Sequence, residues 1–196
     1  MKKVGSTVAE FLIVGLGNPG DEYARTRHNA GFRTIDLLGD ECGARYWKNE
    51  CGSLTAKGVY RDHDLVLAKP QSFMNVSGGP VKKLCDAYGI DGEHLIVVHD
   101  EIDIDPGTVR VKFGGGHAGH NGLRSICDKL GTRDWFRVRC GVGRPPGRMD
   151  VADFVLSVPR GDAADDFDYA VDRASQATLS LITDGLEKTQ QAFNRA

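Results

Sequence analysis

Two residues of this sequence have side chains that could together carry out acid–base chemistry near neutral pH. His28 lies in the polar segment 25–29, just before a stretch with helical periodicity, and imidazole has the ordinary side-chain pKa closest to pH 7. A catalytic histidine needs a partner that fixes its tautomer, and a carboxylate at the end of a strand is the usual kind. Asp100 follows an expected strand and is the best-placed candidate. Because the two residues are far apart in the sequence, spacing leaves their pairing open.

Three asparagines accompany them at expected strand ends and at a helix start. Asn18 follows the apolar run 11–16, Asn75 follows the run 65–68, and Asn121 comes with His120 at the start of a helical pattern. In a sheet covered by helices, functional sites gather where strands end. The candidate chemistry therefore falls at one edge of the expected sheet.

A metal site is the first alternative. Suitable ligand atoms are offered by His99, Asp100, Glu101, His117 and His120, but their spacing matches no His-Glu-x-x-His helix and there is no cysteine cluster. The segment 114–122 has too many glycines to hold ligands rigidly. A glycine-rich loop before a helix better suits close backbone approach or anion binding, so we expect no metal.

Serine and cysteine nucleophiles are also disfavoured. Ser77 in Asn75-Val76-Ser77-Gly78-Gly79 does not form a Gly-x-Ser-x-Gly elbow, and we expect it to cap a helix. The five cysteines form no Cys-x-x-Cys pair, and none lies near a basic motif. We therefore expect reduced core thiols in a cytosolic protein.

The segment Gly15-Leu16-Gly17-Asn18-Pro19-Gly20 raises a dinucleotide-binding alternative. It follows an expected strand and matches Gly-x-Gly-x-x-Gly, and Asp36 or Asp40 has the spacing of a ribose-binding acid. That fold needs a helix to open inside the motif. Pro19 lies within it, however, and the helical pattern starts only near Ala30, so a single match is weak support.

The surrounding pattern mixes strands and helices along the whole chain. Strands are predicted at 11–16, 53–60, 64–68, 95–99, 109–113 and 136–142, and helices at 30–38, 81–88 and 123–130, with two more helices between 162 and 194. No linker or repeat divides the 196 residues. We expect one α/β domain over 1–196, with a twisted mixed β-sheet and helices on both faces, phosphorylase/hydrolase-like.

Composition and charge limit the class of protein. Hydrophobic content of 40% and charged content of 27% are ordinary for a globular chain. The start of the sequence does not match a signal peptide, and no apolar run reaches membrane-spanning length, so we expect a cytoplasmic protein. Net charge is −2, but residues 105–148 carry nine basic against three acidic residues, and residues 150–196 carry nine acidic against four basic. This asymmetry permits a local basic surface for a polyanion.

Taken together, the motifs closely resemble those of the bacterial-type peptidyl-tRNA hydrolase family. Their order and rough spacing hold over 11–156, and several motifs in order are far more specific than one. The matching pieces are Gly15-Leu16-Gly17-Asn18-Pro19-Gly20 with Tyr23, Thr26-Arg27-His28-Asn29-Ala30-Gly31, Lys69-Pro70 with Phe73-Met74-Asn75 and Ser77-Gly78, His99-Asp100-Glu101-Ile102-Asp103, Gly114-Gly115-Gly116-His117-Ala118-Gly119-His120-Asn121-Gly122-Leu123, and Phe136-Arg137-Val138-Arg139.

The resemblance implies a cofactor-free monomer that hydrolyses the ester between a peptide and the 3′-terminal ribose of tRNA. It implies that His28 is the general base that activates water and that Asp100 orients it. The remaining implied roles fall into two groups. The peptide, the ribose or the water is held by Asn18, Asn75 and Asn121, in a cleft shaped by Tyr23, Phe73 and Met74, whereas the tRNA 5′-phosphate is clamped by Lys112 and Arg139 and the acceptor stem is faced by Arg124 and Lys129.

The sequence departs from the family pattern at two places. Ala118 stands in the glycine loop where many members carry glycine, and the acidic C-terminal segment matches poorly.

Two other hypotheses remain open: a non-catalytic RNA-binding homologue with the same fold, and a nicotinamide-dependent oxidoreductase based on the Gly15-to-Gly20 match. Retention of His28, Asp100 and the three asparagines counts against the first.

Overall fold

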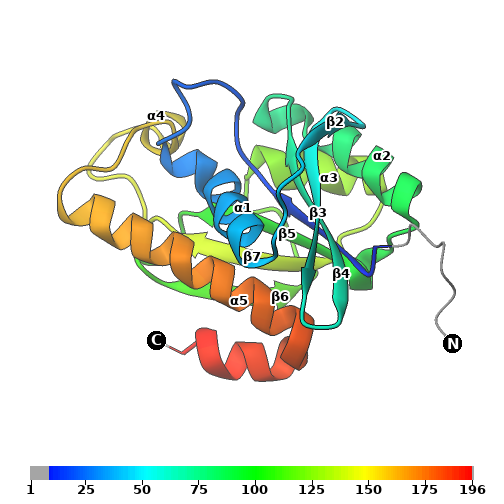
Figure 1. The fold of residues 1–196 in the computed structure, drawn as a ribbon. Helices are drawn as coiled ribbons and strands as arrows, with labels where there is room; N and C mark the ends of the chain where they lie inside the picture. Colours follow the sequence, from blue (N-terminus) through cyan, green and yellow to red (C-terminus); the bar gives the residue numbers. More distant parts are fainter. Residues whose placement is uncertain (1–8, 196) are drawn as a thin grey trace, which may run out of the picture.

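Seven strands form one mixed sheet in the computed structural model, which describes residues 9–195 (Figure 1). In sheet order they are β2 (Lys48–Glu50), β3 (Ser53–Tyr60), β4 (His63–Pro70), β1 (Phe11–Gly15), β5 (Leu95–Glu101), β7 (Phe136–Gly141) and β6 (Val109–Phe113). The four central strands β4, β1, β5 and β7 run parallel to one another. Antiparallel pairs extend the sheet at both ends. The mixed sheet and the β3–β4 hairpin confirm the predictions from periodicity.

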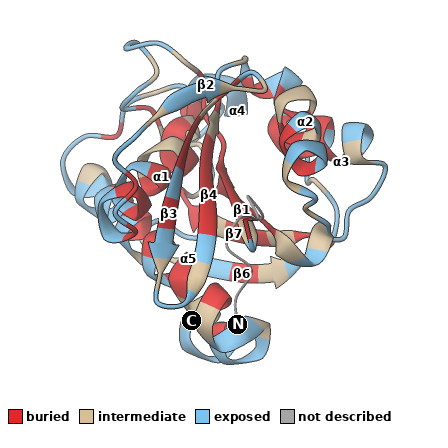
Figure 2. Cartoon of the chain, turned by 45° about the vertical axis from the view of Figure 1, so that its right-hand side comes forward, coloured by how far each residue is buried: buried red, intermediate tan, exposed pale blue. Residues whose placement is uncertain are grey.

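Helices cover both faces of this sheet, as predicted. The α-helices are α1 (Ala30–Glu41), α2 (Gly78–Tyr88), α3 (Asn121–Leu130), α4 (Val151–Val155) and α5 (Asp162–Phe193), and short 3-10 helices are η1 (Arg27–Asn29), η2 (Met74–Val76) and η3 (Gly92–His94). Figure 2 shows the sheet between α1 on one side and α2 with α3 on the other, with buried residues facing inward. Alternate β5 residues divide between two cores: Ile96 and Val98 pack on the side of α1 and α5, and Leu95 and Val97 pack on the side of α2 and α3.

The glycines near the first strand are explained by close packing. A Cβ atom on Gly31 would lie 2.3 Å from the Leu16 nitrogen and 2.4 Å from the Val98 carbonyl oxygen, so the start of α1 touches the backbone of β1 and β5. A Cβ on Gly15 would meet the Gly31 carbonyl oxygen at 2.2 Å. This contact brings η1, with His28, beside the end of β5. No helix opens within residues 15–20, so the geometry that dinucleotide binding requires is not formed there.

Several local predictions need correction. Asp100 lies within β5, because the strand continues to Glu101 with all seven residues buried. Ser77 precedes α2, but its hydroxyl donates to the Met74 carbonyl oxygen instead of capping the helix. The prediction of two helices between 162 and 194, by contrast, is confirmed: the helix Asp162–Phe193 is interrupted at Gly185, whose φ of 80° and ψ of 175° are not helical. The short elements β2 and α4 were not predicted.

No helix within residues 9–195 is long and apolar enough to cross a membrane. The expectation that the chain begins without a signal peptide concerns mainly residues 1–8, which lie outside the described residues.

Candidate active site

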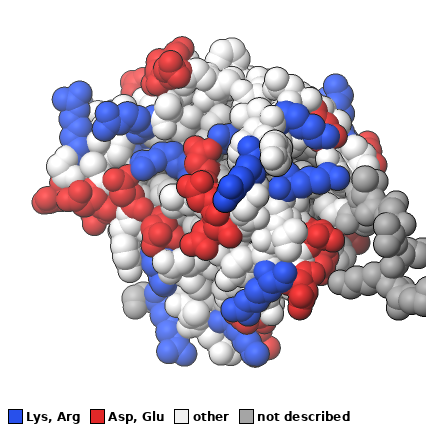
Figure 3. All heavy atoms as spheres, in the orientation of Figure 1, with Lys and Arg blue, Asp and Glu red and all other residues white. Residues whose placement is uncertain are grey.

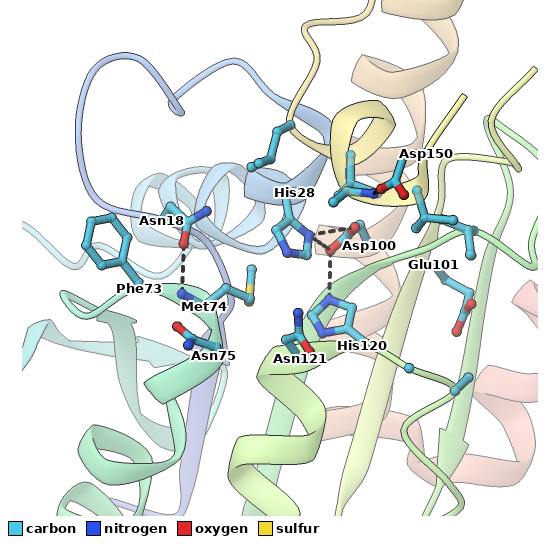
Figure 4. Close-up of a pocket in the computed structure, with 17 residues that line it drawn as sticks. Asn18, His28, Phe73, Met74, Asn75, Asp100, Glu101, His120, Asn121 and Asp150 are labelled. Atoms are coloured by element: carbon cyan, nitrogen blue, oxygen red, sulfur yellow. Dashed lines mark hydrogen bonds and ion pairs between the residues drawn. The ribbon is translucent and has the colours of Figure 1, made fainter. Parts of the chain in front are cut away.

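A cleft of about 550 Å³ opens where the central parallel strands end (Figure 4). It brings together most of the predicted site residues, although they come from five separate parts of the chain. The predicted residues that line it are Asn18, His28, Phe73, Met74, Asn75, Asp100 and Asn121. Tyr23 is not among the lining residues; its ring packs edge-on against Phe73, with 6.4 Å between ring centroids.

His28 and Asp100 are directly hydrogen-bonded, a pairing that the sequence had left open. The His28 Nδ1 atom lies 2.9 and 3.0 Å from the two carboxylate oxygens of Asp100. Because an ionised carboxylate only accepts hydrogen bonds, Nδ1 carries the proton and donates it. Nε2 of the neutral ring is then left as an acceptor, the state that a general base needs.

A second imidazole shares the same carboxylate. The His120 Nε2 atom lies 2.9 Å from Asp100 Oδ1, and the backbone N–H groups of Gly122 and Leu123 donate to His120 Nδ1. Since Nδ1 accepts, the proton is on Nε2 and is donated to Asp100. The position of His120 at the start of a helix was predicted from the sequence, but this contact was not, because no spacing rule relates residues 100 and 120.

Opposing effects set the pKa values of these groups. Burial raises the pKa of the Asp100 carboxyl, but the charges of His28 and His120 and their hydrogen bonds outweigh burial and hold it well below its usual range. Burial lowers the pKa of His28, whereas the Asp100 charge and hydrogen bond raise it, with a net increase. Near neutral pH Asp100 is therefore ionised, and His28 is a somewhat stronger base than an ordinary histidine.

On one side of the cleft, Asn18 is fixed by a network of backbone and amide groups. The Met74 N–H donates to Asn18 Oδ1 at 2.7 Å, and the Asn29 side chain bonds both the N–H and the C=O of Asn18. With Oδ1 occupied, the Asn18 NH₂ group is left to face the cleft (Figure 4). Asn29 has no role that its place in the sequence predicts, although its side chain holds the backbone of Asn18.

Asn121, the first residue of α3, faces the same cleft near His120. Its Oδ1 accepts a hydrogen bond of 2.7 Å from Arg124 Nη2. A guanidinium group only donates, so the amide oxygen faces Arg124 and the NH₂ group is free to donate elsewhere. Around His28 the cleft thus offers one imidazole acceptor and two amide donors.

The rim of the cleft is apolar and partly exposed. Phe73 lies on one side of the cleft and is 59% exposed. Across from it, α4 and the residue after it supply Val151, Val155 and Leu156. Sequence analysis missed α4 because five residues are too few to establish a helical period.

Two basic side chains, Lys112 of β6 and Arg139 of β7, lie near Glu101, which lines the cleft. Lys112 is partly buried, and its pKa is lowered by burial and by the nearby charges of Arg139 and Arg137. Arg139 forms an ion pair with Glu101, with 3.3 Å between its Nη2 atom and the carboxylate Oε2 atom. Arg137 is fully buried instead, and its guanidinium donates to the carbonyl oxygens of Gly115 and Gly116.

A metal ion does not fit the His28–Asp100–His120 cluster well, although ligand atoms of these residues lie within 4.8 Å of one another. A metal bound at His120 Nε2 would force the ring proton onto Nδ1. That atom already accepts two backbone N–H groups at the start of α3, so the required tautomer would be opposed.

The model for the family described as peptidyl-tRNA hydrolase matches residues 12–196 of this chain. The chain belongs to the peptidyl-tRNA hydrolase family. The match extends through α5, which corrects the reading that the C-terminal segment fits the family poorly. The nicotinamide hypothesis is not supported.

Relatives in this family cover nearly the whole chain. A peptidyl-tRNA hydrolase of Streptomyces coelicolor is 50% identical, and the match covers 95% of this chain and 96% of the relative. One from Frankia alni is 47% identical and covers 99% of this chain and 98% of its own length. The crystal structure of peptidyl-tRNA hydrolase from Acinetobacter baumannii has a TM-score of 0.86 at 37% identity, covering 95% and 96% of the two chains.

Proposed function

We propose that this chain hydrolyses the ester bond that joins a peptide, or an N-blocked amino acid, to the 3′-terminal ribose of tRNA, and so recycles tRNA from stray peptidyl-tRNA. One observation carries the proposal. His28 Nδ1 is bonded to a buried carboxylate, which leaves Nε2 free to act as a base in a cleft that also contains two amide donors. The relatives named peptidyl-tRNA hydrolase support the choice of substrate.

In the proposed reaction, His28 Nε2 removes a proton from a water molecule as it attacks the ester carbonyl. The NH₂ groups of Asn121 and Asn18 donate to the oxygen that becomes negatively charged. Asp100 stabilises the imidazolium that forms. When the acyl C–O bond breaks, His28 returns the proton to the ribose oxygen, and the products are a free carboxylic acid and a tRNA hydroxyl.

The peptide is proposed to be recognised through its backbone more than through its side chains. Asn75 would bond peptide or ribose groups, since an amide both donates and accepts. Phe73 and Met74, with Tyr23 packed behind Phe73, would provide an apolar surface. Such contacts suit an enzyme that releases peptides of any sequence.

Recognition of tRNA is proposed to rest on phosphate contacts. Lys112 and Arg139 would clamp the 5′-phosphate, while Arg124 and Lys129 of α3 would face the acceptor stem. The pKa of Lys112 is lowered first by burial and then by the charges of Arg139 and Arg137; the nearness of these cations supports the proposal, because cations held near one another gain from a bound anion. Contacts to phosphate give affinity without base readout, as suits an enzyme that serves many tRNAs.

We further propose that the enzyme needs neither a metal nor a cofactor and acts as a single-domain monomer in the cytoplasm. The bonds from Gly122 and Leu123 to His120 Nδ1 support metal independence, since they oppose the ring tautomer that a metal at Nε2 would need. A histidine base with an amide-lined oxyanion site supplies the required chemistry by itself.

The test is release of the blocked amino acid from N-acetyl-aminoacyl-tRNA with EDTA present, and free aminoacyl-tRNA as the comparison. Rapid cleavage of the blocked substrate alone is expected. Tight tRNA binding without cleavage would identify a non-catalytic RNA-binding homologue, and loss of cleavage in EDTA would overturn metal independence.

A further inference from the structure

The contact between Arg124 and Asn121 joins a residue expected to bind the acceptor stem to one that faces the cleft. The two residues lie three positions apart on α3, and side chains at that spacing are neighbours on one face of a helix. Arg124 Nη2 donates to Asn121 Oδ1 at 2.7 Å. Figure 4 shows Asn121 between Met74 and His120, below His28.

Asn121 differs from Asn18 in how its amide is held. The Asn18 side chain is buried and its Oδ1 accepts from the Met74 backbone. The Asn121 side chain is exposed, and within residues 9–195 Arg124 is its only hydrogen-bond partner. Without that partner, the amide is free to rotate by half a turn and to point its oxygen at the cleft. An oxygen there would repel the developing negative charge, whereas the NH₂ group stabilises it.

We propose that Arg124 is a positioning residue that orients the Asn121 amide and so contributes to turnover as well as to tRNA affinity. The inference rests on the proposed function, in which Asn121 donates to the reacting carbonyl. A guanidinium group has five N–H donors. One can hold Asn121 while others contact a phosphate, so acceptor-stem binding and amide orientation share one side chain.

The test compares two substrates, full-length N-acetyl-aminoacyl-tRNA and an N-acetyl-aminoacyl ester of a 3′-terminal trinucleotide that lacks the stem. With Arg124→Ala, kcat is expected to fall about three- to tenfold on both, the size of losing one charge-assisted hydrogen bond at an exposed position. KM is expected to rise only for the full-length tRNA. The charge-matched control is Arg133→Ala, since that exposed side chain has no hydrogen bond to Asn121, and its kcat is expected to stay unchanged.

A double-mutant cycle isolates the contact. In an Asn121→Ala background, Arg124→Ala is expected to cause no further loss of kcat on the short substrate. Arg124→Lys, which keeps a donor and a charge but not the planar fork, is expected to restore part of it. The proposal is overturned if Arg124→Ala changes only KM for full-length tRNA, or if its effect on kcat persists undiminished without Asn121.

A readout that does not depend on activity separates this inference from the proposed function. In ¹⁵N-labelled protein, the side-chain NH₂ resonances of Asn121 are expected to shift and broaden in Arg124→Ala but not in Arg133→Ala. A wild-type enzyme that cleaved neither substrate would refute the function, and the resonances would still test the contact. Unchanged Asn121 resonances in Arg124→Ala would overturn the positioning role.

Discussion

At the scale of single residues, the arrangement depends on one buried carboxylate that accepts from two imidazoles. Asp100 is only 2% exposed, and a charge so far from water is tolerated only when it is well paired. His28 and His120 supply those partners, each with the proton on the nitrogen that faces Asp100. The carboxylate thus fixes both tautomers at once.

Asp100→Asn is predicted to shift the pH dependence of activity. His28 must be neutral to act as a base, and its pKa is raised because Asp100 outweighs burial. Without that charge, burial dominates and the pKa falls. The acid limb of kcat/KM should therefore move to lower pH, while the plateau falls by roughly 10² to 10⁴ because the tautomer is no longer fixed. A pH–rate profile measures both effects, and an acid limb that stayed in place would contradict the account.

Residue types were easier to predict than residue pairs. His28, Asp100 and the asparagines could be chosen from their chemistry and from their expected places at strand ends or helix starts. The contacts of Asp100 with His120 and of Arg124 with Asn121 could not, because they depend on side-chain directions at the start of α3. From the sequence, Arg137 was one of the basic residues in 105–148. In the structure it is buried and donates to backbone carbonyl oxygens of the glycine loop.

At the scale of elements, the glycine loop before α3 is attached to the sheet through Arg137. This β7 side chain is fully buried, and its guanidinium stacks 4.0 Å from the centre of the Trp135 ring. It donates to the carbonyl oxygens of Gly115 and Gly116. The contacts hold a segment whose glycines give it little stiffness of its own.

Arg137→Met is predicted to loosen this loop. The methionine keeps an apolar stem but leaves both glycine carbonyl oxygens without their donor. Amide hydrogen exchange over residues 114–119 should accelerate, and kcat should fall because His120 and Asn121 follow the loop. Arg110→Met on neighbouring β6, where the side chain is exposed, is the control. Equal exchange in both variants would show that Arg137 does not anchor the loop.

Gly31→Ala is predicted to destabilise the fold strongly. The new methyl group would overlap backbone atoms of Leu16 and Val98 that cannot move freely, at a cost of about 3 kcal/mol. Thermal unfolding should show a Tm lower by roughly 6–12 °C for a chain of this size. Gly116→Ala, whose Cβ would meet nothing within 4 Å, should leave Tm nearly unchanged. A similar Tm for the two variants would refute the packing argument.

Long elements with a clear periodicity were predictable, and short ones were not. Apolar residues at helical spacing identified α1, α2 and α3, and Gly89 and Gly131 end the last two with left-handed conformations. The three residues of β2 and the five of α4 are too short to show a period. Two helices between 162 and 194 were also predicted, but the position of the break between them, at Gly185, was not.

At the scale of the whole molecule, α5 and α3 lie on opposite faces of the sheet and differ in net charge. The acidic side chains of α5 gather along its N-terminal part, at the left of Figure 3. α5 covers one face of the sheet, whereas α3, with Arg124 and Lys129, packs on the other. The net charge of −2 is therefore unevenly distributed over the chain, which is compatible with the proposed contacts between α3 and a polyanion.

Lys112→Ala is predicted to weaken tRNA binding in a salt-dependent way. Each lost phosphate contact makes the negative slope of log K against log salt concentration less steep by about 1. The effect should disappear with tRNA that lacks its 5′-phosphate. Titrations at several salt concentrations measure the slope, and an equal loss with both tRNAs would place the Lys112 contact elsewhere.

The fold class followed from the alternation of strands and helices, and the family followed from motifs that end at residue 156. The C-terminal segment could not be matched from motifs, because α5 contributes packing surface and carries no cleft residue. A packing surface tolerates many apolar side chains and so leaves no short motif.

The central claim is that His28 is the base for ester hydrolysis. The most direct measurement is single-turnover cleavage of N-acetyl-aminoacyl-tRNA by His28→Ala, with the Kd for the same tRNA measured in parallel. The account predicts that the cleavage rate falls by roughly 10² to 10⁴, while the Kd stays close to that of the wild type because His28 contacts no phosphate in the proposed complex. An unchanged cleavage rate at equal affinity would contradict it.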